Sequence, residues 1–251
     1  MDYITKYIEF SQGNVPIVIS VSHGGELNPK RIPNRQSGVQ GIDKKTNELA
    51  KDLLNEFSEL SSKDYNSQIK PSYILSRIAR IKVDFNRPLE KAFNQDSELA
   101  KRIYNYYHNK LKEFVEYNIT NFGKSLLIDI HGFEKEMRPE GYRDVNLVLG
   151  TNNLKSLFDY EVRKKDWDKN VRGLIVDRFL KLGIPIAPGH ARRKEYVLKG
   201  GYITRKYGSS NFKGSKAMQI EFSDTIRINN NSLKKTVLKN LVEILYRSFL
   251  C

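Results

Sequence analysis

Residues 15–26 have the sequence VPIVISVSHGGE, in which an apolar, mostly β-branched run is followed at once by His23 and two glycines. A short apolar run of this kind is typical of a strand that is buried on both faces of a sheet. Residues 125–132, SLLIDIHG, show the same arrangement, with His131 directly after the apolar run. The sequence therefore predicts two buried strands that each end in a histidine.

Helical and strand-like patterns alternate along the rest of the chain. Helices are predicted over residues 42–60, 96–119, 167–182 and 233–249, and Asp43 is predicted as the N-cap of the first. Strands are predicted over residues 15–21, 72–83 (one or two), 125–130, 145–149, 184–187, 202–206 and 217–222. This alternation favours an α/β fold with three layers, in which a mainly parallel mixed sheet has helices on both faces.

The composition is that of an ordinary globular domain. Of the 251 residues, 39% are hydrophobic and 29% are charged, and no apolar run approaches the ~20 residues that span a bilayer. No linker or repeat divides the chain, so one domain over residues 1–251 and no membrane partner are expected. Cys251 is the only cysteine, which excludes an intrachain disulfide and favours a cytoplasmic location. Any metal ion must therefore be held by His, Asp or Glu.

The chain is strongly basic, with 43 Lys and Arg against 29 Asp and Glu and a net charge of +14. Such a charge attracts carboxylates, phosphates or nucleic acid. A biased surface composition explains the same excess, because the basic residues are spread out and the cluster around Arg192 and Arg193 is local. The sequence has no known nucleic-acid motif, so a basic nucleic-acid-binding protein is kept only as the alternative from another class. Its binding would fall steeply with salt and would ignore chelators.

The strand-end histidines indicate a metal site, because sites in parallel sheets form at the carboxyl ends of strands. His23 and Glu26 have the spacing H-x-x-E, which lets both face one ion from a turn, and His131 would add a third ligand from a neighbouring strand. Two imidazoles, one carboxylate and an open fourth position are common in catalytic zinc sites. One zinc ion is therefore predicted. The alternative for His23 is an ordinary turn histidine.

Two carboxylates lie close to these positions in the sequence. Asp129 is two residues before His131 and is predicted either to fix the orientation of that imidazole, to replace Glu26 as a ligand, or to bind a nearby backbone group. Glu221 follows the apolar run AMQI and shares a strand face with Gln219. A carboxylate at this place can accept the proton of an attacking water, so Glu221 is the predicted general base. The alternative is a surface glutamate at the end of the sheet.

Residues 80–88, RIKVDFNRP, form the other dense polar segment. An arginine fork can bind a carboxylate through two parallel hydrogen bonds, a task that suits Arg87 beside Asn86. Arg80 could face the oxyanion that develops at a scissile carbonyl. The alternative is a structural ion pair between Asp84 and one of the two arginines. His108, in a helix, is expected to be solvated or packed. His190 is expected to be an ordinary loop histidine, with contact to the substrate as the alternative.

Six segments together resemble the N-formylglutamate amidohydrolase family, which is related to the zinc carboxypeptidases and to the succinylglutamate desuccinylase and aspartoacylase group. They are SHGGE (22–26), RIKVDFNRP (80–88), DIHG (129–132), LVLGT (147–151), GGYITRKYG (200–208) and MQIEFS (218–223). The resemblance implies a fold like that of the zinc carboxypeptidases and the phosphorylase/hydrolase group. The first motif more often reads P-H-S-G in that family, and this departure leaves the substrate open.

The resemblance also implies roles for individual residues. His23, Glu26 and His131 would be the zinc ligands, Glu221 the general base and Arg80 the partner of the carbonyl or oxyanion. Asn86 and Arg87 would bind the α-carboxylate of the substrate. Independently of the resemblance, Asp84 and Asp129 are predicted as supporting carboxylates behind the site.

The predicted activity is that of a zinc-dependent amidohydrolase acting on a linear amide. Its substrate would be a small, anionic N-acylated acidic amino acid, and the foremost candidate is N-formyl-L-glutamate, which yields formate and L-glutamate. The alternative within enzymes is a carboxypeptidase-like protein or another N-acyl amino acid deacylase that uses the same metal site.

Overall fold

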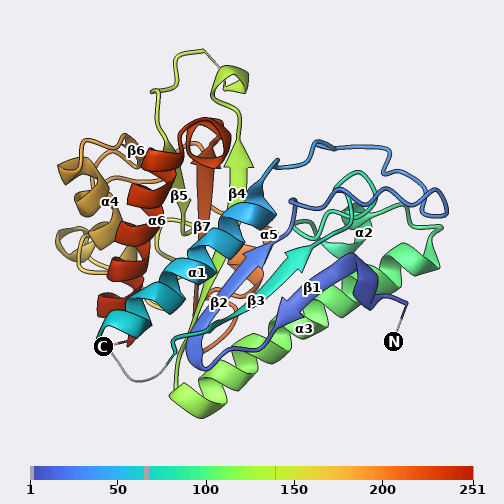
Figure 1. Cartoon of the computed structure of the whole chain (residues 1–251), viewed down its shortest axis with the longest axis horizontal. Coiled ribbons are helices and arrows are strands. Elements are labelled where there is room, and N and C mark those ends of the chain that lie inside the picture. The colour runs from blue at the N-terminus through green and yellow to red at the C-terminus, as the bar shows by residue number, and fades with distance from the viewer. Residues whose placement is uncertain (1–2, 65–67, 139, 251) are drawn as a thin grey trace.

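The computed structural model describes residues 3–64, 68–138 and 140–250, with the backbone alone for residues 61–64. In this part of the chain seven strands form one sheet in the order β1-β3-β2-β4-β7-β5-β6 (Figure 1). Four of the six strand pairings are parallel, and β1–β3 and β7–β5 are antiparallel. The strands are β1 (Ile8–Ser11), β2 (Val15–Val21), β3 (Pro71–Ser76), β4 (Ser125–Phe133), β5 (Leu147–Gly150), β6 (Ile186–Ala187) and β7 (Ser215–Ser223).

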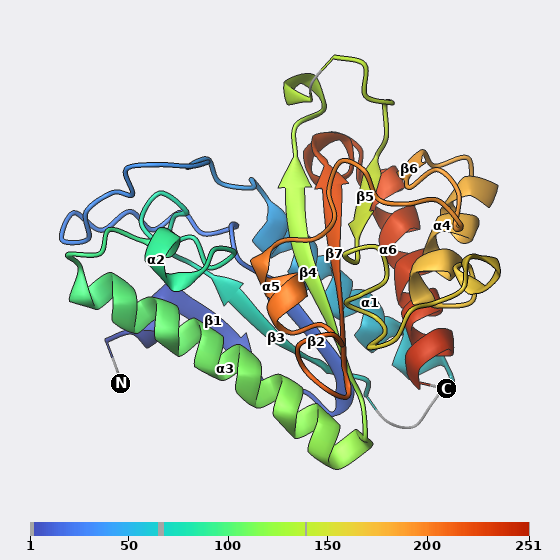
Figure 2. The ribbon, with the colours of Figure 1, turned by 180° about the vertical axis from the view of Figure 1, so that it is seen from behind.

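Helices cover both faces of this sheet. On one face lie α1 (Thr46–Asp64), α4 (Val171–Lys181) and α6 (Asn231–Leu245), and on the other lie α3 (Glu98–Phe122) and the short α5 (Tyr202–Lys206) (Figures 1 and 2). The one-turn helix α2 (Leu89–Ala92) precedes α3. The expected three-layer α/β architecture with a mainly parallel mixed sheet is thus confirmed. Shorter helical turns cover Thr5–Tyr7, Lys135–Met137, Lys164–Asp166, Thr225–Asn229 and Tyr246–Leu250.

The sheet separates two hydrophobic cores. In β4, Leu126, Ile128 and Ile130 pack with residues of α1 and α6, whereas Leu127 packs with residues of α3. Successive side chains of a strand point to opposite faces, so Asp129 lies on the α3 face together with Leu127. The same alternation in β7, together with its parallel register to β4, puts four polar side chains at the carboxyl ends of the strands on this face. They are Asp129, His131, Gln219 and Glu221.

Helix α3 begins and ends at residues that favour helix termini. The Ser97 side chain accepts a hydrogen bond from Ala100 N, and Gly123 adopts a left-handed conformation with φ of 72° at the C-terminus. A serine N-cap and a left-handed glycine after the last turn satisfy backbone groups that would otherwise lack partners. The predicted helix over residues 96–119 is therefore confirmed, with an end three residues further along the chain.

Two predictions of local structure were wrong. Residues 202–206 form helix α5 rather than a strand, because distant side chains bind its first backbone N–H groups. Gly201 N donates to Gln219 Oε1 at 2.6 Å, and Ile203 N donates to Asn86 Oδ1 at 2.9 Å. Asp43 is not the N-cap of α1, which begins at Thr46, because the Asp43 carboxylate faces the two strand-end histidines instead.

Strand β1 was not anticipated, and residues 77–83 make only isolated bridges instead of a second strand. In the described segments, no helix is long and apolar enough to cross a membrane.

Candidate metal and active site

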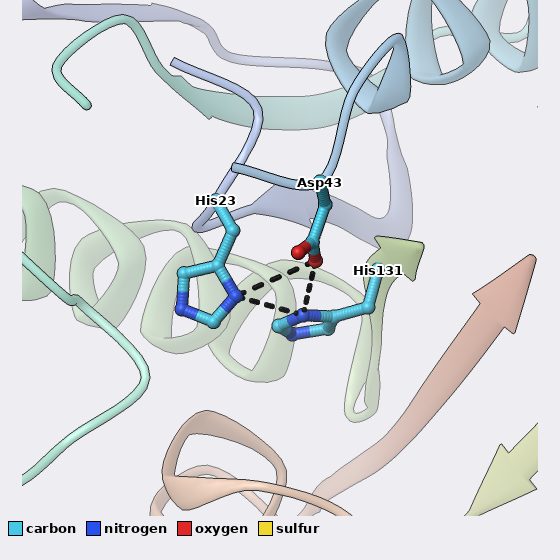
Figure 3. Close-up of side chains that lie close together, drawn as sticks. All are labelled: His23, Asp43 and His131. Atoms are coloured by element: carbon cyan, nitrogen blue, oxygen red, sulfur yellow. Dashed lines mark hydrogen bonds and ion pairs between the residues drawn. The ribbon is translucent and has the colours of Figure 1, made fainter. Parts of the chain in front are cut away.

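Three buried side chains converge at the carboxyl ends of β2 and β4 (Figure 3). His23 Nδ1 and His131 Nδ1 lie 3.1 Å apart, and Asp43 Oδ2 lies 3.1 Å from His131 Nδ1 and 3.5 Å from His23 Nδ1. His23 follows β2 and His131 is in β4, whereas Asp43 precedes α1. A backbone hydrogen bond of 3.0 Å from Asp43 N to His23 O joins the two loop segments.

The spacing of these atoms is compatible with a bound metal ion. Zinc binds imidazole nitrogen and carboxylate oxygen at about 2.0–2.2 Å with tetrahedral geometry, which sets the ligand atoms about 3.3–3.6 Å apart. The three observed separations of 3.1–3.5 Å approach this range without any rearrangement of the backbone. Three such ligands would leave one position open for water or substrate.

Each imidazole has a carboxylate at its other ring nitrogen. His23 Nε2 lies 2.7 Å from Asp84 Oδ1, and His131 Nε2 lies 2.8 Å from Asp129 Oδ2. The second oxygen of Asp129 accepts a 2.6 Å hydrogen bond from Ser20 Oγ. An imidazole that donates Nε2–H to a carboxylate presents the lone pair of Nδ1, and metal-binding histidines commonly have such a partner.

Asp84 is fully buried and contacts two arginines and a backbone N–H group in addition to His23. Its Oδ2 accepts from Arg80 Nε at 3.0 Å and lies 3.3 Å from Arg35 Nη1, while Oδ1 accepts from Asn86 N at 3.0 Å. Burial alone would raise the pKa of Asp84, but His23, Arg80 and Arg35 hold that pKa well below its usual range. Asp84 is therefore a permanent anion that fixes these side chains in place.

Asp43 is also an anion in this arrangement. Burial acts to raise its pKa, but hydrogen bonds with His131 and His23 hold the pKa well below its usual value. Its Oδ2 accepts a further hydrogen bond of 3.1 Å from Gly132 N, and its Oδ1 lies 3.8 Å from Arg80 Nη1. Arg80 thus lies next to the converging ligand atoms and makes the ion pair with Asp84 that was the structural alternative.

Glu221 lies beside this cluster on the neighbouring strand, directly opposite His131 in the register of β7 and β4. Its Oε1 accepts a 2.7 Å hydrogen bond from Gln219 Nε2. Burial raises the pKa of Glu221, and the charge of Asp43 adds to this effect while His131 opposes it. A carboxylate with a raised pKa can both accept and return a proton near neutral pH.

Asn86 and Arg87 have different surroundings. Asn86 is buried, with Nδ2 3.2 Å from His131 Nε2 and Oδ1 bound to Ile203 N, so its amide is held between β4 and α5. The Arg87 side chain is 36% exposed and lies at the edge of the cluster, with Nε 4.0 Å from Asp84 Oδ2. Tyr104 Oη donates to Arg87 O at 2.8 Å and fixes the backbone there. Arg87 thus presents a solvent-accessible guanidinium beside the candidate metal site.

The structure does not bring Glu26 into the cluster. The Glu26 side chain is exposed, and the group of potential ligands found among the described residues contains Asp43 in its place. Sequence reasoning assigned Asp43 to a helix cap because caps and ligands use the same residue type. It also missed Arg35, which no local pattern distinguishes from the other arginines.

The glycines after His23 allow a close approach of the backbone. A Cβ atom on Gly25 would lie 2.3 Å from Ile78 O, and one on Gly24 would lie 2.5 Å from the Asn47 side chain. The chain after β2 therefore passes directly against the start of α1 and the segment after β3. This packing brings Asp84 and Asp43 to opposite sides of the His23 ring.

The two remaining histidines of the chain lie apart from the three converging atoms. His108 is buried in α3, where its ring nitrogens lie 3.0 Å from Phe85 O and 3.1 Å from Tyr207 Oη, and burial lowers its pKa to about 3. His190 is exposed in a loop and accepts a hydrogen bond from Arg192 N.

Comparisons with known proteins show that solved structures share this fold. No protein-family model matches the sequence, and no curated protein matches it. The structure is similar to the crystal structure of N-formylglutamate amidohydrolase from Ralstonia eutropha JMP134, with a TM-score of 0.62, 16% identity and coverage of 96% of both chains. It is also similar to the gene product Atu2144 from Agrobacterium tumefaciens, with a TM-score of 0.65 and 13% identity over 100% of this chain and 97% of that chain. The resemblance seen in the sequence motifs is thereby confirmed at the level of the fold.

Proposed function

We propose that the protein is a metal-dependent amidohydrolase that cleaves the amide of an N-acylated acidic amino acid. The observation that carries this proposal is the convergence of His23 Nδ1, His131 Nδ1 and Asp43 Oδ2 beside the buried carboxylate of Glu221. Carboxylates behind both imidazoles support a site organised for a metal ion.

The proposed ligands are His23, His131 and Asp43, with Asp43 in the place that the sequence motif gave to Glu26. Two nitrogen donors and one carboxylate oxygen in a three-ligand set suit zinc. When bound, the ion would supply Lewis acidity, which polarises the amide carbonyl and lowers the pKa of water at the site.

The protein side chains then perform the remaining steps. Glu221 accepts a proton from the water that attacks the amide carbon and later gives that proton to the leaving amine nitrogen. Arg80 stabilises the oxygen that becomes negative in the transition state, a role supported by the 3.8 Å distance from its Nη1 to Asp43 Oδ1. Arg87 binds the α-carboxylate of the substrate. Asn86, whose amide lies against His131, helps to hold the same carboxylate.

N-formyl-L-glutamate is the proposed substrate, hydrolysed to formate and L-glutamate. The shared sequence motifs, the similar fold of a protein that carries this name and the exposed Arg87 guanidinium support this choice. The net charge of +14 agrees with an anionic substrate.

Metal analysis combined with a substrate panel tests the proposal. The purified protein is expected to hold one zinc ion, to lose activity with a chelator and to regain it with zinc. The panel contains N-formylglutamate, N-acetylaspartate, N-succinylglutamate and short peptides, so that a deacylase or carboxypeptidase-like activity would be recognised. Absence of stoichiometric metal together with no hydrolysis of any of these amides would refute the function.

Glu221→Gln separates the base from the metal site. Loss of the base is expected to lower kcat about 10²–10⁴-fold while metal content stays at one ion. Glu113→Gln is the matched control, because Glu113 makes only a surface ion pair with Lys110. Full turnover in Glu221→Gln with zinc bound would exclude Glu221 as the base.

A further inference from the structure

A row of directly paired residues extends from the active site across the sheet. His131 of β4 is opposite Glu221 of β7, Glu221 is opposite Val148 of β5, and Val148 is opposite Ala187 of β6. Figure 2 shows these four strands side by side. Paired residues share a face, and adjacent strands are about 4.8 Å apart. Val148 is therefore one strand away from the proposed base, and Ala187 is two strands away.

A cavity of about 290 Å³ lies over this end of the row. Val148, Ala187 and Pro188 contribute apolar lining, and the rest comes mainly from Arg138, residues 141–143 and residues 193–198. Four of the lining side chains are cationic, namely Arg138, Arg143, Arg193 and Lys194. The single acidic lining residue, Glu195, is buried and paired with Arg172 at 2.9 Å, so the field in the cavity is positive.

Two of the four cations have structural partners. Arg143 Nη2 donates to Ile186 O at 2.6 Å, and Arg138 Nη1 donates to Arg143 O at 2.9 Å. The side chains of Arg193 and Lys194 make no hydrogen bond or ion pair within residues 3–64, 68–138 and 140–250. Arg193 and Lys194 are therefore the charges that remain for a ligand.

The segment that carries these two cations is held by a buried ion pair. Arg172 is fully buried and donates to Ala191 O at 2.9 Å and to Arg193 O at 2.5 Å. Its partner Glu195 accepts hydrogen bonds from Thr151 N and Asn153 N, both at 2.9 Å. The backbone on both sides of Arg193 and Lys194 is thus fixed before any ligand binds, which reduces the entropy lost on binding.

The position of the cavity identifies which part of a substrate would enter it. Arg87 lies on the β2 side of the cluster, next to Asp84 and Tyr104, whereas the cavity lies beyond Glu221 in the direction of β5 and β6. An amide whose α-carboxylate binds Arg87 therefore directs its acyl group toward Val148. A formyl group has a single carbon and would leave most of the 290 Å³ empty.

We propose that this cavity is an acyl subsite that takes an acyl chain ending in a carboxylate, which Arg193 and Lys194 bind. This inference rests on the proposed amidohydrolase function and extends it to acyl groups such as glutaryl. With N-glutaryl-L-glutamate, water adds its oxygen to the glutaryl carbonyl carbon, the C–N bond breaks, and the amine nitrogen takes the proton. The products are glutarate and L-glutamate.

The first test compares two substrates in the double variant Arg193→Ala/Lys194→Ala. The ratio of kcat/KM for N-glutarylglutamate to that for N-formylglutamate is expected to fall about 10-fold or more, as for loss of a hydrogen-bonded charge. Arg192→Ala is the matched control, because Arg192 pairs with Asp168 and does not line the cavity. This control is expected to keep the wild-type ratio.

The second test measures binding of glutarate to the metal-free protein by calorimetry, so that it depends on neither metal nor turnover. Weaker binding in the double variant, with unchanged binding in Arg192→Ala, supports the subsite even if no amide is hydrolysed and the proposed function fails. Equal glutarate affinity and an equal substrate ratio in the double variant overturn the subsite, even if N-formylglutamate is hydrolysed and the function stands.

Discussion

Asp84 Oδ1 lies 2.7 Å from His23 Nε2, on the side of the imidazole opposite to the nitrogen that faces Asp43 and His131. The carboxylate therefore selects the tautomer with hydrogen on Nε2 and leaves the lone pair of Nδ1 directed at the cluster. Asp129 has the same relationship to His131 at 2.8 Å. Two separate segments of the chain thus orient the two imidazoles toward one point.

Asp129→Asn tests whether this orientation supports metal binding. The amide is a poorer hydrogen-bond acceptor than the carboxylate, and loss of such a partner commonly lowers metal affinity by about 10–100-fold. Competition with a chelator measures the change, and Asp166→Asn, which alters only a surface ion-pair cluster, is the control. Unchanged zinc affinity in Asp129→Asn would show that Asp129 has no part in the metal site.

Asp43→Asn and Glu26→Gln together identify the third ligand. If Asp43 is the ligand, Asp43→Asn loses the anionic oxygen and most of the bound zinc, whereas the exposed Glu26 can be changed without loss of metal. Metal content after dialysis distinguishes the two variants. The reverse result, with metal lost only in Glu26→Gln, would restore the assignment based on the H-x-x-E spacing.

Asp43 and Glu26 also show which part of the site could not be predicted from the sequence. His131, Asp129 and Glu221 follow from the two-residue period of strands, which puts them on one face at the carboxyl ends. The position of Asp43 depends on how the loop after β2 folds back to α1, for which the sequence contains no periodic signal. A carboxylate before a helix favours the N-cap locally, but here the tertiary contacts with His131 and His23 prevail.

The same distinction applies to the fold. Strands β2 and β4 contain apolar runs, and their burial on both faces could be predicted from their composition. Residues 202–206 have a composition that fits either a strand or a helix. Hydrogen bonds from Gly201 N to Gln219 and from Ile203 N to Asn86 stabilise the helix, and both partners are distant in sequence.

Arg87→Ala is expected to raise KM for N-acyl amino acids by about 10-fold with little change in kcat. The guanidinium is partly exposed and is proposed to bind the α-carboxylate equally in the ground state and in the transition state. Steady-state kinetics on N-formylglutamate measures the effect, and Arg102→Ala on the exposed side of α3 is the control. If KM stays the same for every N-acyl amino acid tested, Arg87 does not bind the carboxylate.

His108 is expected to make the protein less stable in acid. Its pKa is about 3 in the folded protein because of burial, against the ordinary value of 6.5, so below pH 6.5 the unfolded chain binds a proton that the folded chain does not. The free energy of unfolding therefore falls as the pH decreases from 6.5 toward 3. Between pH 7.5 and 5 this single group accounts for a loss of about 2 kcal/mol.

His108→Gln isolates this contribution. The variant loses the hydrogen bonds of the imidazole with Phe85 O and Tyr207 Oη, so its stability at pH 7.5 is expected to be lower than that of the wild type. Between pH 7.5 and 5, its free energy of unfolding should nevertheless fall by about 2 kcal/mol less than that of the wild type. Urea unfolding at both pH values measures this difference. His190 is exposed, so His190→Gln should show the same change in the free energy of unfolding between the two pH values as the wild type. If the free energy of unfolding falls equally in His108→Gln and in the wild type, His108 takes up its proton in the folded protein. The space between α3 and α5 then admits a charged imidazole.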